Sequence, residues 1–134
     1  MRDIKFRIWD KGKSDWINPK DANLYTEFSK ENKCNFFVGA AADSGIILSE
    51  STGLNDEDSN PIYEGDIVDF YDEDIGYSRG KICFEAGMFI IACDKFEDSY
   101  KGLNEFANSE GWCDYVRVKG NIYQDLKLLE ENKQ

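Results

Sequence analysis

The fold of this chain is decided by one stretch, Ser51-Thr52-Gly53-Leu54 followed by Pro61-Ile62-Tyr63-Glu64-Gly65-Asp66-Ile67-Val68. It predicts a loop, a tight turn and a buried strand in quick succession. Pro61 has no backbone N–H to donate to a ladder, so a strand begins at it or after it. Gly65 favours a tight turn, because glycine adopts positive φ without a steric penalty. The apolar residues from Ile67 onward then predict a strand in the core.

The rest of the chain also predicts short strands joined by glycine-containing turns. Near the N-terminus, Ile4, Phe6 and Ile8 alternate with cationic side chains, so we expect a hairpin from residue 3 to about residue 18. Further strands are expected within residues 34–38, 46–48, 67–71, 77–84, 88–93 and 112–118. This spacing predicts a mainly β fold, a small barrel or roll with minor helix.

The remaining segments give weaker signals. Residues 72–74 predict an exposed acidic loop, and residues 18–33 do not discriminate between helix and strand. The spacing of apolar residues in 103–107 predicts one short helix with Gly111 as its C-cap. A helix is also one interpretation of the leucine-containing tail after Tyr123.

The composition argues against some classes of partner. Hydrophobic residues make up 41% of the 134-residue chain, enough to form a core without disulfides or metals. The formal net charge is -11, and a field of that sign repels phosphate backbones, so nucleic-acid binding is not expected. Residues 50–79 hold ten acidic side chains against Arg79 alone. We interpret this acidic segment either as a solvated surface or as a site for cations or a basic partner.

The chain contains no histidine, which excludes Ser-His, Cys-His and histidine-dependent metal chemistry within one chain. Its four cysteines are irregularly spaced, without the C-x-x-C pair of a zinc or redox site. Cys83 and Cys93 lie within apolar runs, which favours buried, reduced thiols. The apolar run at 88–93 is far shorter than the ~20 residues of a membrane span. We therefore expect a soluble cytoplasmic protein without cofactor or metal.

Three blocks of the sequence, taken together, resemble one protein family. They are Arg2-Asp3-Ile4-Lys5-Phe6-Arg7-Ile8-Trp9-Asp10, then Thr52-Gly53-Leu54 with Ile62-Tyr63-Glu64-Gly65-Asp66-Ile67-Val68, and finally Val118-Lys119-Gly120-Asn121-Ile122-Tyr123. In order and spacing they resemble the YopX family of small phage and prophage proteins of Gram-positive bacteria. Two positions depart from that family's pattern: Asp58-Ser59 stands where the family commonly has Asn-Gly, and Leu126 where it often has proline.

The resemblance implies an SH3-like β-barrel or roll in residues 51–134 and a β-rich region in residues 1–50, either as two regions or as one compact unit. It also implies a phage or prophage origin, and hence the cytoplasm of a bacterial host. It brings no catalytic activity, so we expect no enzyme and interpret the motif residues as structural. These residues are Trp9, Gly53, Tyr63, Glu64, Gly65, Asp66, Gly120, Asn121 and Tyr123.

Two groups of carboxylates could carry chemistry, and each also has a structural interpretation. Glu64 and Asp66 flank a turn glycine, where carboxylates commonly accept hydrogen bonds from turn amides instead of acting as acid and base. The spacing within Asp56–Asn60 matches the first half of a calcium-binding loop. However, Pro61 and Ile67 stand where that loop needs glycine and a bidentate glutamate. We favour the structural interpretation for both groups.

Aromatic residues could form an exposed platform that binds a peptide or a single nucleic-acid strand, as on other small barrels. Tryptophans at such places belong more often to the core. The residues considered for the platform are Trp9, Trp16, Trp112, Tyr63, Tyr71, Tyr77 and Tyr123.

No coherent catalytic set is present, so we expect a non-enzymatic protein that forms a homo-oligomer or binds a host protein. Exposed strand edges in a small barrel offer a route to self-association. One alternative is an acidic mimic of nucleic acid that inhibits a host DNA-binding protein, which requires carboxylates along one face. Another is a weak nucleic-acid-binding barrel that uses Lys5, Arg7, Lys11 and Lys13 beside aromatic residues, although the net charge argues against it.

Overall fold

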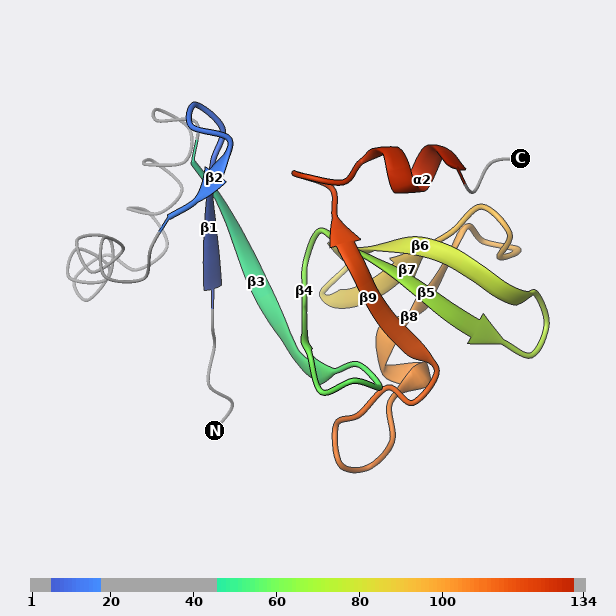
Figure 1. The fold of residues 1–134 in the computed structure, drawn as a ribbon. Helices are drawn as coiled ribbons and strands as arrows, with labels where there is room; N and C mark the ends of the chain where they lie inside the picture. The colour runs from blue at the N-terminus through green and yellow to red at the C-terminus, as the bar shows by residue number, and fades with distance from the viewer. Residues whose placement is uncertain (1–5, 18–45, 132–134) are drawn as a thin grey trace. The chain divides into compact units, whose positions relative to one another are not determined.

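The computed structural model describes residues 6–17 and 46–131. These residues divide into two compact units between Glu50 and Ser51, and strand β3 (Ile46–Asn55) contributes to both (Figure 1). The strand expected within residues 34–38 and the ambiguous segment 18–33 lie outside the described residues. That residues 1–50 and 51–134 act as separate domains stays a prediction.

The expected mainly β architecture is confirmed. Strands make up most of the described residues, and all paired strands are antiparallel. In chain order the elements are β1 (Phe6–Asp10), β2 (Asp15–Trp16), β3 (Ile46–Asn55), β4 (Pro61–Tyr63), β5 (Asp66–Asp72), β6 (Gly76–Glu85), β7 (Met88–Ala92), β8 (Tyr100–Gly102), the 3-10 helix η1 (Leu103–Phe106), β9 (Val116–Asn121) and α2 (Lys127–Glu131).

The first unit is a small antiparallel sheet. β1 pairs with β2 and with the first half of β3, so the expected N-terminal hairpin is confirmed over its described residues. Trp9 is buried, and its ring packs edge-on against Trp16 with 5.0 Å between the ring centroids. Arg7 lies over the Trp16 ring at 4.5 Å and donates from Nε to the Ser49 hydroxyl at 3.0 Å. Arg7 is therefore used within its own unit.

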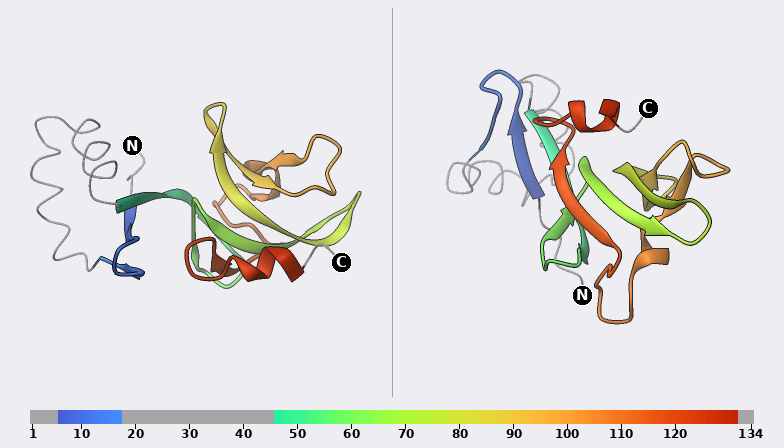
Figure 2. Two further views of the ribbon diagram at one scale, coloured as in Figure 1. Left: turned by 90° about the horizontal axis from the view of Figure 1, so that it is seen from above. Right: turned by 45° about the vertical axis from the view of Figure 1, so that its right-hand side comes forward.

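The second unit is built on a five-stranded sheet with the order β8-β7-β6-β5-β9. Strands β5 and β6 curve strongly, as Figure 2 shows from two directions. Because side chains alternate along a strand, Val68 and Phe70 of β5 point to one face, which we call the inner face. That face carries the hydrophobic core, whose buried members are Ile62, Val68, Phe70, Ile82, Ile91, Cys93, Phe96, Leu103, Cys113 and Val116. The opposite face is the outer face.

The loop expected at Ser51–Leu54 is wrong. These residues continue β3 as far as Asn55, and β3 pairs there with β4. The pairing register shifts between Ser51 and Asn55, and Gly53 within this irregularity has a φ of 82°. A bulge with a left-handed glycine lets a strand continue through a residue that otherwise predicts a turn. The strand start at Pro61 and the turn at Gly65, whose φ is 89°, are confirmed.

Asp72 was expected in an exposed acidic loop, and this is also wrong. It is the last residue of β5, it is buried, and one of its oxygens lies 2.6 Å from Lys101 Nζ. The hydrogen bond from Lys101 holds the pKa of the Asp72 carboxyl below its usual range, against an opposing effect of burial. The same hydrogen bond raises the pKa of Lys101. The pair joins the end of β5 to β8.

Two further boundaries differ from the expectation. The short helix begins at Leu103 as expected, but it is a single 3-10 turn that ends at Phe106. Its C-cap is Ala107 and not Gly111. β9 begins at Val116, whereas the expected strand begins at residue 112. The residues before it form isolated bridges, Trp112 with Asn55 and Cys113 with Ala107, because they meet different elements in turn.

A short helix follows β9, which confirms the helical interpretation of the leucine-containing tail. Arg79 donates from Nη1 to the Leu128 carbonyl at 3.3 Å, and this contact attaches α2 to the outer face of β6. Among the described residues, no helix has the length and apolar character needed to cross a membrane.

Candidate functional site

Three tyrosines form a row across the outer face of the second unit. Tyr71 of β5 pairs directly with Tyr77 of β6, and its backbone N–H donates to the Tyr115 carbonyl at 3.0 Å. Because the neighbours Phe70 and Val116 point to the inner face, these tyrosines point to the outer one. Strand register therefore gathers residues that are up to 44 positions apart in sequence (115 minus 71).

We call these three rings the tyrosine cluster: Tyr77 and Tyr115 each contact Tyr71, and all three rings are open to solvent. The ring centroids of Tyr71 and Tyr77 are 5.0 Å apart with an angle of 57° between the planes. Those of Tyr71 and Tyr115 are 6.1 Å apart at 54°. Tyr77 is 84% exposed and Tyr115 66% exposed, whereas most large aromatic rings are at least partly withdrawn from water. Because Tyr77 and Tyr115 are tilted against Tyr71, the three rings do not make a flat platform.

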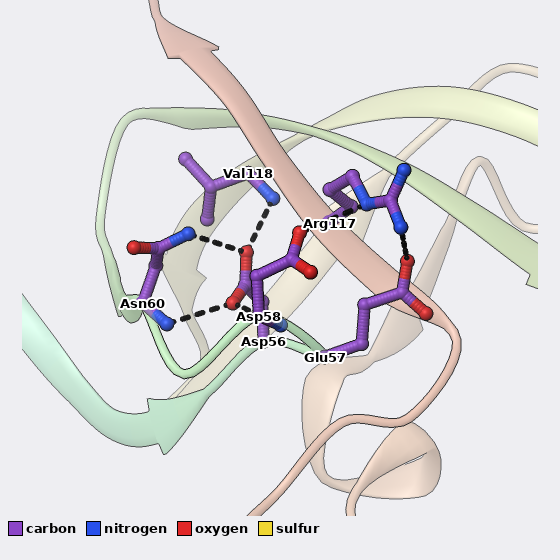
Figure 3. Close-up of polar contacts among 6 residues, drawn as sticks. All are labelled: Asp56, Glu57, Asp58, Asn60, Arg117 and Val118. Carbon is purple, nitrogen blue, oxygen red and sulfur yellow. Dashed lines mark hydrogen bonds and ion pairs between the residues drawn. The ribbon is translucent and has the colours of Figure 1, made fainter.

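A row of ion pairs lies next to the tyrosine cluster on the same face. Asp69 pairs in register with both Arg79 and Arg117 on the neighbouring strands. Arg79 donates to both Asp69 oxygens, at 2.5 Å and 3.1 Å. Arg117 contacts Glu57 at 2.7 Å and Asp58 at 3.0 Å (Figure 3). Both arginines are thus neutralised by carboxylates of the same chain.

The tyrosine cluster borders a cleft with a volume of about 470 Å³. This volume lies within the range of about 300–1,000 Å³ that is typical of ligand-binding clefts. Its lining residues are Glu57, Asp69, Phe70, Tyr71, Tyr77, Asp114, Tyr115, Arg117 and Lys119. The cleft is thus lined by aromatic rings together with carboxylates and cations.

Asp56 precedes Glu57 of the cleft and accepts a set of hydrogen bonds that join its loop to β9 (Figure 3). Its side chain is fully buried, and Oδ1 accepts from the backbone N–H groups of Asp58 at 2.9 Å and Asn60 at 2.8 Å. Oδ2 accepts from the Val118 N–H at 2.9 Å and from the Asn60 side chain at 3.4 Å. This carboxylate is occupied by amides, so the calcium-like spacing has a structural role.

The same loop covers one edge of the sheet. Glu57 N–H donates to the Val116 carbonyl at 2.9 Å, and Val118 N–H is bonded to Asp56. These are backbone groups of β9 that face away from its partner β5. An edge whose ladder groups are satisfied does not readily pair with another chain. Along this part of β9, the strand-edge route to self-association is therefore closed.

Two of the family-motif blocks meet at the opposite end of β5. Asp66 pairs in register with Asn121, and the Gly65 carbonyl accepts from the Ile122 N–H at 2.8 Å. Buried Asp66 accepts from the Tyr63 N–H at 2.8 Å. The Asn121 side chain accepts from the backbone N–H groups of the two residues that follow Ile122, at 3.0 Å and 2.9 Å. The carboxylate and the amide hold turns.

The motif glycines are required by close contacts in the same region. A Cβ on Gly65 would lie 2.8 Å from the Tyr123 hydroxyl and 2.9 Å from its ring, and a Cβ on Gly120 would lie 2.5 Å from Asp125. The structure thus brings together Tyr63, Gly65, Asp66, Gly120, Asn121 and Tyr123, with Glu64 in the same turn. Gly53 lies in the β3 bulge and Trp9 in the first unit. None of these motif residues lines the cleft.

The acidic segment 50–79 is less available to a partner than its charge suggests. Of its ten acidic side chains, three are buried and accept hydrogen bonds, namely Asp56, Asp66 and Asp72. Three more are ion-paired with arginine, namely Glu57, Asp58 and Asp69. At least six of the ten carboxylates are thus engaged within the chain, so the ten do not form an open array.

The sequence analysis predicted some of the residues that line the cleft but not all of them. Of the aromatic residues considered for a platform, Tyr71 and Tyr77 belong to the tyrosine cluster. Tyr115, Asp114 and Lys119 were not considered. One signal was available, because Tyr115 and Arg117 alternate with apolar valines and so share a face. Periodicity does not predict which strand will lie next to these residues in the sheet.

The described cysteines have no feature of a reactive site. Cys93 and Cys113 are buried and Cys83 is half-buried, all as free thiols. Burial raises the pKa of the Cys113 thiol to about 11, with smaller effects of the Asp114 and Asp56 carboxylates. Burial also raises the pKa of Cys83. Within residues 6–17 and 46–131, no group of three or more Asp, Glu or Cys side chains is arranged to hold a metal ion.

Similarity to known proteins supports a family assignment. The family model described as YopX protein matches residues 5–130. The crystal structure of protein EF1440 from Enterococcus faecalis is similar to this chain, with a TM-score of 0.57 and 16% identity over 96% of this chain and 99% of that chain. The crystal structure of protein yopX from Bacillus subtilis has a TM-score of 0.45 and 21% identity over 66% of this chain and 62% of that chain.

At these identities a solved structure is informative about the fold alone, and no curated protein matches the chain. The family model covers nearly the whole sequence, including the second and third blocks of the resemblance and the first block from Lys5 onward. The chain belongs to the YopX family.

Proposed function

We propose that the protein is a non-enzymatic protein-interaction module whose binding surface is the tyrosine cluster with its cleft. The observation that carries this proposal is the exposure of three contacting tyrosine rings on one face, two of them exposed by more than half. Tyrosine and arginine are enriched where proteins bind one another, since a tyrosine offers a large contact area with few rotatable bonds. Here Arg117 lies beside the rings, held by two carboxylates.

The acidic-mimic alternative is less well supported. A mimic of nucleic acid needs carboxylates exposed along one face, whereas six of the ten in the acidic segment are buried or ion-paired. Binding of nucleic acid is disfavoured by the net charge of -11. We retain the proposal that the protein is an accessory protein of phage or prophage origin that acts in the bacterial cytoplasm.

Affinity capture with the full-length protein as bait tests the proposal. The double variant Tyr77→Ser/Tyr115→Ser removes the two most exposed rings, and Tyr100→Ser is the matched control. Tyr100 is 47% exposed but belongs to β8, outside the cluster. We expect one protein to be captured by the wild type and by the control and to be lost with the double variant. Circular dichroism of all three proteins checks that they are folded.

Light scattering of the wild type at high concentration separates a host partner from a second copy of this chain. A mass that falls to that of a monomer in the double variant indicates self-association through the cluster. A monomeric wild type that captures no protein contradicts the proposed function, as does a captured protein that the double variant retains.

A further inference from the structure

We infer that the tyrosine-lined cleft binds the guanidinium group of an arginine presented by a partner protein. This inference rests on the proposed function and specifies the chemistry of its site. An organic cation is attracted to the face of an aromatic ring when it lies within ~6 Å of the ring centroid. Arginine adds a planar group that stacks on such rings and donates in parallel to a carboxylate.

The geometry of the rings suits such a cation. With centroids 5.0 Å and 6.1 Å from Tyr71, the other two rings flank it closely enough for one planar cation to contact two ring faces. The rings of Tyr77 and Tyr115 are tilted by 57° and 54° against Tyr71, and all three rings line the same cleft. Asp114 lines this cleft beside Tyr115 and provides a carboxylate for the guanidinium N–H groups. Rings and carboxylate together form the two contacts that arginine prefers.

The charge around the cleft also favours a cation, although by a small margin. The lining side chains and their ion-pair partners comprise four carboxylates and three cations, a net charge of -1. They are Glu57, Asp58, Asp69 and Asp114 against Arg79, Arg117 and Lys119.

Asp114 makes no ion pair among the described residues and accepts only a long hydrogen bond, 3.4 Å, from the Asn108 side chain. The electrostatic field of the whole chain, which has a net charge of -11, attracts cations to the protein. The positive charge of Lys119 in the cleft lining repels a bound cation, so removing this charge should strengthen cation binding.

The arginines that the structure describes favour a different protein as the source of the bound arginine over a second copy of this chain. All three arginines that the structure describes are already engaged. Arg7 lies over Trp16 and bonds Ser49, whereas Arg79 and Arg117 are ion-paired with carboxylates. Presenting one of them to another copy breaks these contacts. A partner with a free arginine on an exposed segment carries no such penalty.

The test uses NMR of the full-length protein with a blocked tripeptide that has arginine at its centre. The matched probe is the same tripeptide with citrulline, which is neutral and has nearly the same shape. We expect the arginine peptide to shift the ring resonances of the tyrosine cluster and to bind about tenfold more tightly than the citrulline peptide. Asp114→Asn weakens this binding, and Lys119→Gln strengthens it by about two- to fivefold.

Ring variants separate cation binding from hydrogen bonding to the hydroxyls. Tyr77→Phe retains the ring face and keeps arginine binding, whereas Tyr77→Ser loses it. Equal binding of arginine and citrulline, or loss of binding in Tyr77→Phe, overturns the inference. Displacement of the arginine peptide by a short oligothymidine, which would reveal an anion site, overturns it as well. If the arginine peptide fails while the serine variants still abolish capture of a protein, the proposed function stands without this inference.

Discussion

Replacing Asp56 with asparagine tests whether this carboxylate holds the β3–β4 loop against β9. The two oxygens accept four hydrogen bonds in all, three of them from backbone N–H groups. Asparagine keeps one oxygen and replaces the other with NH₂. In either orientation of the amide, its NH₂ group faces two hydrogen-bond donors that the lost oxygen had accepted from. At least one of these two donors is a backbone N–H.

The expected effect follows from the burial of this residue. Asp56 is 0% exposed, so water does not replace the lost acceptor. A hydrogen bond to a charged group contributes about 1.5–3 kcal/mol, and a buried donor left without an acceptor costs about 1–3 kcal/mol. For Asp56→Asn we expect the free energy of unfolding to fall by about 3 kcal/mol. In urea this lowers the midpoint by roughly 1–2 M with an unchanged slope.

Asp58→Asn is the matched control, two residues away in the same loop. Its side chain is 51% exposed and makes one surface ion pair with Arg117, which also keeps its contact with Glu57. Such pairs contribute about 0.2–1 kcal/mol. Amide hydrogen exchange at Val118 gives a second readout, and its rate should rise in Asp56→Asn alone. Equal urea midpoints for the two variants would refute the assigned role of Asp56.

Three other predictions follow from the same structure. Gly65→Ala should lower the free energy of unfolding, measured in urea, by about 2–4 kcal/mol, because the new Cβ would meet the Tyr123 ring at a residue with positive φ. Gly87 also has positive φ but open space around it, so Gly87→Ala should cost only about 1 kcal/mol. Equal effects of the two variants would contradict the contact with Tyr123. Because the pKa of Asp72 is lowered in the folded protein, its carboxylate stabilises the fold above the unfolded pKa of 3.8, and this contribution is lost as the pH falls through the lower folded pKa. Between pH 5 and pH 2, the urea midpoint should therefore fall less in Asp72→Asn than in the wild type. Parallel curves of urea midpoint against pH would contradict this. A chain of residues 51–134 should fold alone with the near-ultraviolet circular dichroism of its tyrosine and tryptophan side chains intact, since the core of the second unit lies within it; an unfolded fragment would show that residues 1–50 are required.

Local sequence was sufficient for the strands and turns of the second unit. Alternation along residues 67–71 and the glycine between Glu64 and Asp66 depend on neighbouring residues alone, and both predictions are confirmed. The loop expected at Ser51–Leu54 failed for a definite reason. A bulge at Gly53 allows a strand where isolated residues favour a turn, and the pairing with β4 that stabilises it is not local.

The roles of individual carboxylates were decided by contacts between distant residues. Asp56, Asp58 and Asp72 have the same side chain and lie in one acidic segment. Asp56 is buried and accepts a hydrogen bond from the Val118 amide, 62 positions away, and Asp72 is buried and accepts one from Lys101. Asp58, in contrast, lies at the surface. No periodicity distinguishes them, because burial depends on which strand packs across the loop.

By itself the sequence therefore determined the class of fold, the family and the lack of histidine chemistry, since these depend on composition, local periodicity and motif spacing. Only the tertiary structure decided where a binding surface lies. The register of β5 with β6 and its contact with the segment before β9 place Tyr71 beside Tyr77 and Tyr115. That register is set by side chains packing on the inner face, and its consequence appears on the outer one.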